Sequence, residues 1–139
     1  ICAIANIGPD SDGFVFFGVA DKESDSNRIE QLDGVQAVRV GNRFVVGVDR
    51  ELPLLATNLE AYVKRIVGVV SASELSPNLK HQVASQVDTI TYKGLSVIRL
   101  RVPPQKEVSF LGEKAYIREG SSTTEASGKK LLAVNATFS

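Results

Sequence analysis

The stretch Phe14-Val15-Phe16-Phe17-Gly18-Val19-Ala20 is a continuous run of aromatic and β-branched residues, and it indicates the fold class. An unbroken apolar run of this length is typical of a strand that is buried on both faces. We therefore expect it to be the central strand of a sheet. Gly18 inside the run indicates a bulge or a close approach of another backbone segment.

A first β-hairpin and a helix are predicted after that strand. Residues 36–40 and 43–48 alternate between polar and apolar side chains, and Gly41-Asn42 joins them as a tight turn because both residues accept positive φ. Asn58 is a good N-cap for a helix that begins at Leu59, whose apolar side chains recur on one face. This helix is expected to cover the sheet.

A second hairpin is predicted further along the chain. Residues 82–92 alternate in polarity, Lys93-Gly94 supplies the turn, and residues 95–102 form the returning strand. Because side chains alternate between the two faces of a strand, Arg99 and Arg101 are expected to project together.

These elements predict an α+β fold with a mixed, largely antiparallel sheet, β-hairpins and covering helices. A chain of 139 residues buries roughly two thirds of its unfolded surface, so we expect residues 1–139 to form a single domain. Ile1–Asn6 has the pattern of a helix end without its beginning, and we therefore expect the domain to be part of a longer protein.

The composition is that of a mixed globular fold, with 43% hydrophobic and 23% charged residues. No apolar run approaches the ~20 residues that cross a bilayer, so we expect no membrane partner and a cytoplasmic location. Residues 1–35 carry two basic and seven acidic side chains, whereas residues 36–139 carry fourteen and nine. This asymmetry fits an anionic ligand on the later part of the chain, and ordinary solvated surface explains it equally well.

The single cysteine and single histidine restrict the chemistry of the chain. Cys2 has no second cysteine for an internal disulfide, and His81 alone leaves a zinc site without ligands. No Gly-x-Ser-x-Gly motif accompanies His81, so we interpret it as a surface histidine. No metal site and no cofactor is predicted, unless carboxylates hold Mg²⁺ or Mn²⁺.

The most chemically focused stretch is residues 115–125, AYIREGSSTTE. A short apolar strand carries Arg118 and then breaks at Gly120 into hydroxyls and a carboxylate. Ser122-Thr123-Thr124-Glu125 has the spacing of a capping box, which predicts a helix over residues 123–134. The same helix start could seat a phosphate oxygen, with Arg118 beside it. The residues alone leave both roles open.

A positive strip is a second candidate for anion binding. It would form if the last two predicted strands pair, because their segments carry the following basic residues: Arg99, Arg101, Lys106, Lys114 and Arg118. Such an array is what phosphate contacts require. The alternative is a set of salt-bridged surface strands, since glutamates lie in the same segments.

Asp21 follows the predicted central strand and is the single candidate catalytic carboxylate. Phosphodiester cleavage with a metal ion needs two or three clustered acids, and no partner acid is evident near it in the sequence. A turn-forming aspartate is the alternative. Residues 22–27, which follow it, are expected to be a polar loop.

Four segments follow one another along the chain: Ile1–Asn6, Gly13 leading into residues 17–21, Val102-Pro103, and residues 116–123 (YIREGSST). In this order they resemble the Schlafen/AlbA-type DNA-binding domain family. The resemblance implies an α+β domain attached to bacterial transcriptional regulators or helicase-like proteins, and related to the nuclease core of animal Schlafens. Two departures stand out: residues 7–12 replace a shorter Asn-x-Gly-Gly link, and the two upstream glutamates of the nucleases lie outside the sequence, whereas Asp21 matches their aspartate.

From the residues and the resemblance together, we expect a module that binds DNA or RNA without base-specific chemistry. The expected phosphate contacts are Arg118, Ser121, Ser122, Thr123, Arg99, Arg101 and Lys114. The alternatives are a metal-dependent ribonuclease fragment that uses Asp21 and a domain for protein interaction or homo-oligomerisation.

Overall fold

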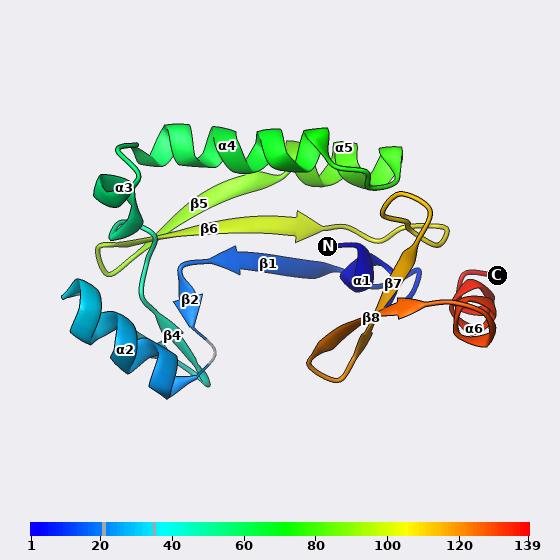
Figure 1. The fold of residues 1–139 in the computed structure, drawn as a ribbon, viewed down its shortest axis with the longest axis horizontal. Helices are drawn as coiled ribbons and strands as arrows, with labels where there is room; N and C mark the ends of the chain where they lie inside the picture. The colour runs from blue at the N-terminus through cyan, green and yellow to red at the C-terminus, as the bar shows by residue number, and fades with distance from the viewer. Residues whose placement is uncertain (21, 35) are drawn as a thin grey trace. The chain divides into compact units, whose positions relative to one another are not determined.

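The computed structural model describes residues 1–20, 22–34 and 36–139 and shows a mixed α+β protein (Figure 1). Every strand pair whose register it describes is antiparallel. The helices are α1 (Cys2–Ala5), α2 (Glu23–Asp33), α3 (Glu51–Leu54), α4 (Leu59–Ala72), α5 (Pro77–Ser85) and α6 (Lys129–Thr137). The strands are β1 (Gly13–Phe17), β2 (Val19–Ala20), β3 (Val38–Val40), β4 (Arg43–Val45), β5 (Val87–Tyr92), β6 (Leu95–Val102), β7 (Ala115–Glu119) and β8 (Ser122–Ala126).

The strands form three sheets, with the orders β1-β6-β5, β2-β4-β3 and β7-β8. The chain divides into two compact units. The first unit comprises Ile1–Val15, Val67–Gln86 and Leu100–Ser139, and the second comprises Phe16–Ile66 and Val87–Arg99. The single-domain expectation stays a prediction. Among the described residues, no helix is long and apolar enough to span a membrane.

The predicted central strand is wrong in two respects. It breaks at Gly18, whose φ is 97°, into the separate strands β1 and β2. The central strand of the first sheet is β6, whereas β1 lies at an edge and leaves Phe14 and Phe16 40% and 48% exposed. The predicted close approach at Gly18 is confirmed, because Val46 N–H and Gly47 N–H both donate to its carbonyl oxygen at 2.9 Å.

Two local features of the second unit are confirmed. Val40 and Arg43 pair across the predicted Gly41-Asn42 turn, where Gly41 has a φ of 59°. The Asn58 Oδ1 accepts a hydrogen bond from Ala61 N–H at 2.9 Å and so caps α4, as expected. The predicted loop at residues 22–27 is wrong, because α2 already begins at Glu23 and ends before Gly34, whose φ is 67°.

The second predicted hairpin is confirmed at its turn but is shorter than expected. Lys93 and Gly94 have φ angles of 49° and 80°, as a two-residue turn with positive φ requires, and join β5 to β6. Residues 82–85 belong to α5 and not to a strand, because Pro77 starts a helix that buries Leu79 and Val83 on one face. His81 lies on the exposed side of this helix, which confirms a surface histidine.

The first unit contains a small core between the β7–β8 hairpin and α6. Its buried members are Val108, Ala115, Ala126 and Val134, and partly buried side chains packed against them are Phe110, Ile117, Leu131 and Phe138. Because side chains alternate along β7 and β8, only one face of the hairpin contributes to this core. Figure 1 shows the hairpin (orange) with its loop directed away from α6 (red). The other face and the loop are therefore left for other contacts.

Candidate nucleic-acid interface

The stretch 115–125 is a β-hairpin, so the predicted capping box is wrong, and the helix predicted over residues 123–134 is present only from Lys129 onward. Arg118 pairs with Thr123 and Glu119 with Ser122, so Gly120-Ser121 forms a two-residue turn in which Gly120 has a φ of 61°. Threonines favour a pleated strand, and cross-strand pairing holds residues 122–126 extended. Helix α6 begins only at Lys129, so no helix terminus lies at Ser122 for a phosphate.

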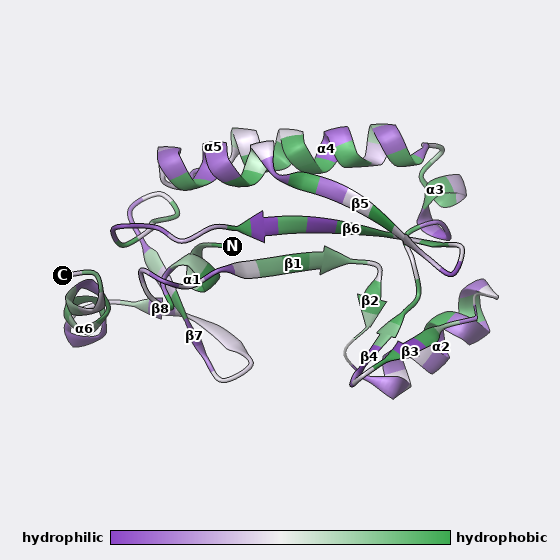
Figure 2. Cartoon of the chain, turned by 180° about the vertical axis from the view of Figure 1, so that it is seen from behind, coloured by the Kyte–Doolittle hydropathy of each residue, from purple (hydrophilic) through white to green (hydrophobic). Residues whose placement is uncertain are grey.

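The tip of the hairpin is exposed at six consecutive residues, from Arg118 to Thr123. The Arg118 Nη1 donates to Thr123 Oγ1 at 3.1 Å, which aligns the guanidinium with a hydroxyl on the opposite strand. Arg118 forms no ion pair with any described residue. In Figure 2 the loop of the hairpin is pale, without the green of apolar side chains. The tip therefore presents a cation and hydroxyls to solvent.

The carboxylate of Glu119, the residue after Arg118, points to the opposite face of the hairpin from Arg118 and is paired there with a cation. Glu119 Oε1 accepts from Lys130 Nζ at 2.6 Å and from Thr124 Oγ1 at 2.7 Å. The hydrogen bond from Lys130 is the main reason that the pKa of the Glu119 carboxyl lies below its usual range, and the Thr124 hydroxyl adds to it. Glu119 therefore competes little with an incoming anion for the Arg118 guanidinium.

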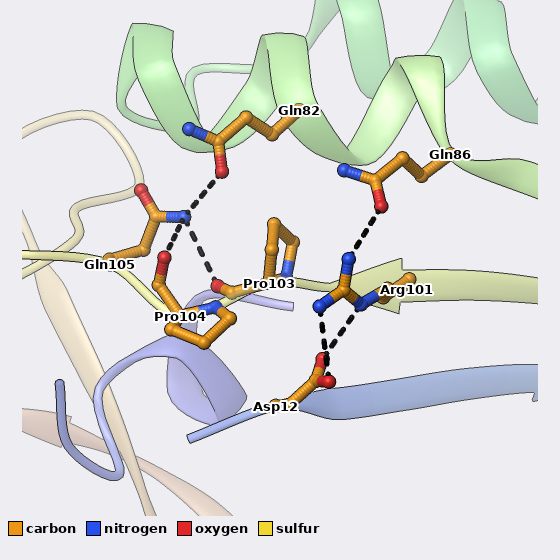
Figure 3. Close-up of polar contacts among 7 residues, drawn as sticks. All are labelled: Asp12, Gln82, Gln86, Arg101, Pro103, Pro104 and Gln105. Carbon is orange, nitrogen blue, oxygen red and sulfur yellow. Dashed lines mark hydrogen bonds and ion pairs between the residues drawn. The ribbon is translucent and has the colours of Figure 1, made fainter. Parts of the chain in front are cut away.

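Arg101 is occupied by neighbours within the first unit (Figure 3). Its Nε and Nη2 donate to the two Asp12 carboxylate oxygens at 2.9 and 3.1 Å, and its Nη1 donates to Gln86 Oε1 at 3.0 Å. The hydrogen bonds that Arg101 donates to the Asp12 carboxylate raise the pKa of Arg101 above its ordinary value. A phosphate would have to displace the Asp12 carboxylate to reach this guanidinium.

Arg99, in the second unit, is also paired. Its Nε and Nη2 donate to the two carboxylate oxygens of Asp88 at 3.1 and 2.6 Å. This contact lowers the pKa of Asp88 and raises that of Arg99. Both β6 arginines thus carry a carboxylate partner, as in the salt-bridged alternative, but the partners are Asp88 and Asp12 and not the glutamates of the same segments.

The strand pairing that would create the positive strip is not formed. β7 pairs with β8, whereas β6 pairs with β1 and β5, so the condition for the strip, a pairing of the last two predicted strands, is not met. The sequence did not indicate that residues 122–126 form a strand, and this strand takes the place beside β7. Lys114 lies directly before β7, is exposed, and forms no ion pair with any described residue. Of the side chains predicted to contact phosphate, Arg118 and Lys114 are therefore the cations in or directly before β7 that remain available to an anion.

The residue that anchors the hairpin was not predicted from the sequence. Asn6 is 4% exposed, and its Nδ2 donates to the carbonyl oxygens of Ser109 and Tyr116 at 2.9 and 2.8 Å. Its Oδ1 accepts from Ser109 N–H at 2.7 Å. The sequence indicated Asn6 as a helix stop, and α1 does end there, but a side chain that joins three segments has no signature in local spacing.

The candidate catalytic residue Asp21 lies outside the described residues. In the described part of the chain, no three histidine, cysteine, aspartate or glutamate side chains converge as a metal site would require. The ribonuclease alternative stays a prediction that depends on Asp21.

Comparison with protein-family models, with curated proteins and with solved structures finds no match to this chain. The resemblance to the Schlafen/AlbA family and the roles assigned to its residues therefore stay predictions.

Proposed function

We propose that this chain binds DNA or RNA through backbone phosphates, with the β7–β8 hairpin as the contact element. The observation that carries the proposal is the state of Arg118, a solvent-exposed guanidinium that forms no ion pair with the described residues and lies beside the Thr123 hydroxyl. Guanidinium groups bind phosphate oxygens through two parallel hydrogen bonds, and hydroxyls add further donors.

The predicted contacts divide into two groups. Arg118, Lys114 and the hydroxyls of Ser121, Ser122 and Thr123 are accessible at the hairpin or directly before it. Arg99 and Arg101 would contact phosphate only by giving up their aspartate partners, so we assign them a smaller contribution. A two-stranded β-ribbon also has dimensions that the major groove of B-DNA accepts.

The proposal also includes the Schlafen/AlbA relationship and a role as a module of a bacterial transcriptional regulator. The support for these is the order of sequence motifs, of which residues 116–123 form the proposed contact element.

Fluorescence anisotropy with labelled single- and double-stranded DNA and RNA tests the proposal. Binding should weaken steeply as salt rises, because each phosphate contact releases counterions and contributes about −0.9 to the slope of log K against log salt on duplex DNA. Flat titrations with all four probes at low salt would refute the function.

A further inference from the structure

The first unit contains a pocket of about 590 Å³, which shares Arg118 and Thr123 with the proposed nucleic-acid contacts and is lined otherwise mainly by residues that the nucleic-acid proposal does not use. Its walls come from α1, the end of α4 and the face of the β7–β8 hairpin that points away from the small core. Apolar side chains dominate the lining, among them Ile4, Val70, Leu75 and Tyr116. Small-molecule sites are of this kind, with volumes of about 300–1,000 Å³ and few polar groups.

Ser73, which follows α4, adds a hydroxyl to the lining, and the other hydroxyl and charged side chains lie together on the hairpin side of the pocket. Tyr116, Arg118 and Thr123 line it, and the strand register places Arg118 directly opposite Thr123. Because alternate residues of a strand share a face, Tyr116 and Arg118 point to the same side, while Glu119 points to the other. Glu125, opposite Tyr116, shares the pocket face but neither lines the pocket nor pairs with Arg118. The lining therefore includes a cation with no described counter-ion.

The apolar lining continues to the surface at the mouth of the pocket. Val69 and Leu111 line the pocket and are 65% and 40% exposed. Large aliphatic side chains exposed beside a concave site favour an apolar partner, because covering them removes hydrophobic surface from water. A purely ionic ligand such as inorganic phosphate would leave this surface uncovered.

We propose that this pocket binds a small amphipathic carboxylic acid, with its hydrocarbon chain in the apolar cavity and its carboxylate on the Arg118 guanidinium. The cavity volume fits a chain of about eight carbons with room for water at the open side. Charge complementarity selects an acid over an alcohol or an amine of the same length, because only a carboxylate accepts two parallel hydrogen bonds from arginine. This assignment shares Arg118 with the proposed phosphate contacts, but its test uses no nucleic acid, so either proposal can fail without the other.

Isothermal titration calorimetry of residues 1–139 with octanoate, 1-octanol, octylammonium and acetate tests the proposal. Octanoate should bind with one-to-one stoichiometry, 1-octanol at least about tenfold more weakly, and octylammonium and acetate not measurably, since each lacks one of the two recognised parts. Equal binding of octanoate and 1-octanol would overturn the assigned role of Arg118. Absence of octanoate binding would overturn the site. This holds even if light scattering shows a dimer in which a second copy of the chain covers the pocket.

Two variants locate the site. Arg118→Gln should weaken octanoate by about tenfold or more and leave 1-octanol unchanged, because it removes only the charge-assisted contact. Val69→Glu should abolish octanoate binding, since it places a carboxylate at the mouth on an exposed helical position that does not support the core. Leu132→Glu is the matched control, because Leu132 is 71% exposed on α6 and does not line this pocket. Octanoate affinity that is lost in Leu132→Glu, or retained in Val69→Glu, would contradict the proposal.

Discussion

Asn6 and Ser109 exchange a pair of hydrogen bonds across 103 positions of sequence, with Nδ2 donating to Ser109 O at 2.9 Å and Ser109 N–H donating to Oδ1 at 2.7 Å. The same Nδ2 reaches Tyr116 O in β7 at 2.8 Å. A side-chain amide carries a donor and an acceptor side by side, which is why it can replace a strand partner. Asn6 thereby ties the end of α1 to the loop before β7 and to β7 itself.

Asn6→Ala should lower the free energy of unfolding by at least about 2 kcal/mol, because buried Ser109 N–H and the Tyr116 carbonyl lose this partner and Ser109 O keeps only the weak donor Cys2 Sγ. Urea denaturation followed by circular dichroism measures the change. Asn135→Ala, an exposed position of α6 in the same unit, is the control and should change stability by about 0.5 kcal/mol or less. A similar loss in both variants would show that Asn6 has no special role.

Asp49 holds β6 in the second unit through both of its carboxylate oxygens. Ser96 N–H donates to Oδ2 at 2.7 Å and Ser96 Oγ donates to Oδ1 at 2.8 Å. Asp49→Ala should cost about 2–3 kcal/mol of stability, since a charge-assisted pair is lost and a buried N–H is left without a partner. Asp49→Asn keeps one oxygen acceptor and should cost clearly less in the same denaturation experiment. Equal losses would show that the charge, and not the acceptor geometry, is what matters.

Gly18→Ala should destabilise the protein by about 3 kcal/mol or more, as measured by thermal or urea unfolding. Its φ of 97° is unfavourable for alanine, and an added Cβ would lie 3.0 Å from the Gly47 carbonyl carbon and 3.1 Å from Ser96 O. Gly41→Ala is the control, because Gly41 also has positive φ but has open space around it, and it should cost only about 1 kcal/mol. If the two variants lose the same free energy of unfolding, the close approach of other backbone atoms to Gly18 does not add to the cost of the substitution.

The buried thiol of Cys2 makes stability depend on pH in the alkaline range. Burial raises the pKa of Cys2 above its ordinary value of 9.0, so the folded state holds the proton more tightly than the unfolded state does. The stabilising effect is fully present below about pH 8 and is lost as the pH rises through the unfolded pKa and beyond. The stability difference between wild type and Cys2→Ala should therefore fall by up to about 1.4 kcal/mol per pH unit above pH ~9. A difference that stays constant from pH 7 to 10 would contradict this.

Arg118, which forms no ion pair with a described residue, and Arg99, which is paired with Asp88, are expected to affect nucleic-acid affinity differently. Arg118→Gln should weaken binding by about tenfold at low salt and reduce the salt slope by about 1, because it removes one phosphate contact. Arg99→Gln removes the same formal charge but breaks a pair with Asp88, so it should change affinity by less than about threefold. Anisotropy titrations of both variants at two salt concentrations make the comparison. Equal effects would mean that overall charge, and not the hairpin, controls binding.

The sequence by itself determined the α+β class, the turns at Gly41-Asn42 and Lys93-Gly94, and the Asn58 cap of α4. These features depend on residues within about four positions of each other, so their physical cause is contained in a short window. The same local logic misassigned residues 122–126, because Ser122 to Glu125 satisfies both a helix cap and a paired strand.

Only the tertiary structure decided between such alternatives. β7 pairs with β8 and not with β6, Arg101 finds Asp12 across 89 positions, and Asn6 finds Ser109 across 103. These contacts form between segments that approach only when the chain has folded, and many partners of equal chemistry are available to each along the sequence. Hence the fold class and turns could be predicted from local sequence, whereas the availability of Arg118 and the occupation of Arg99 and Arg101 could not.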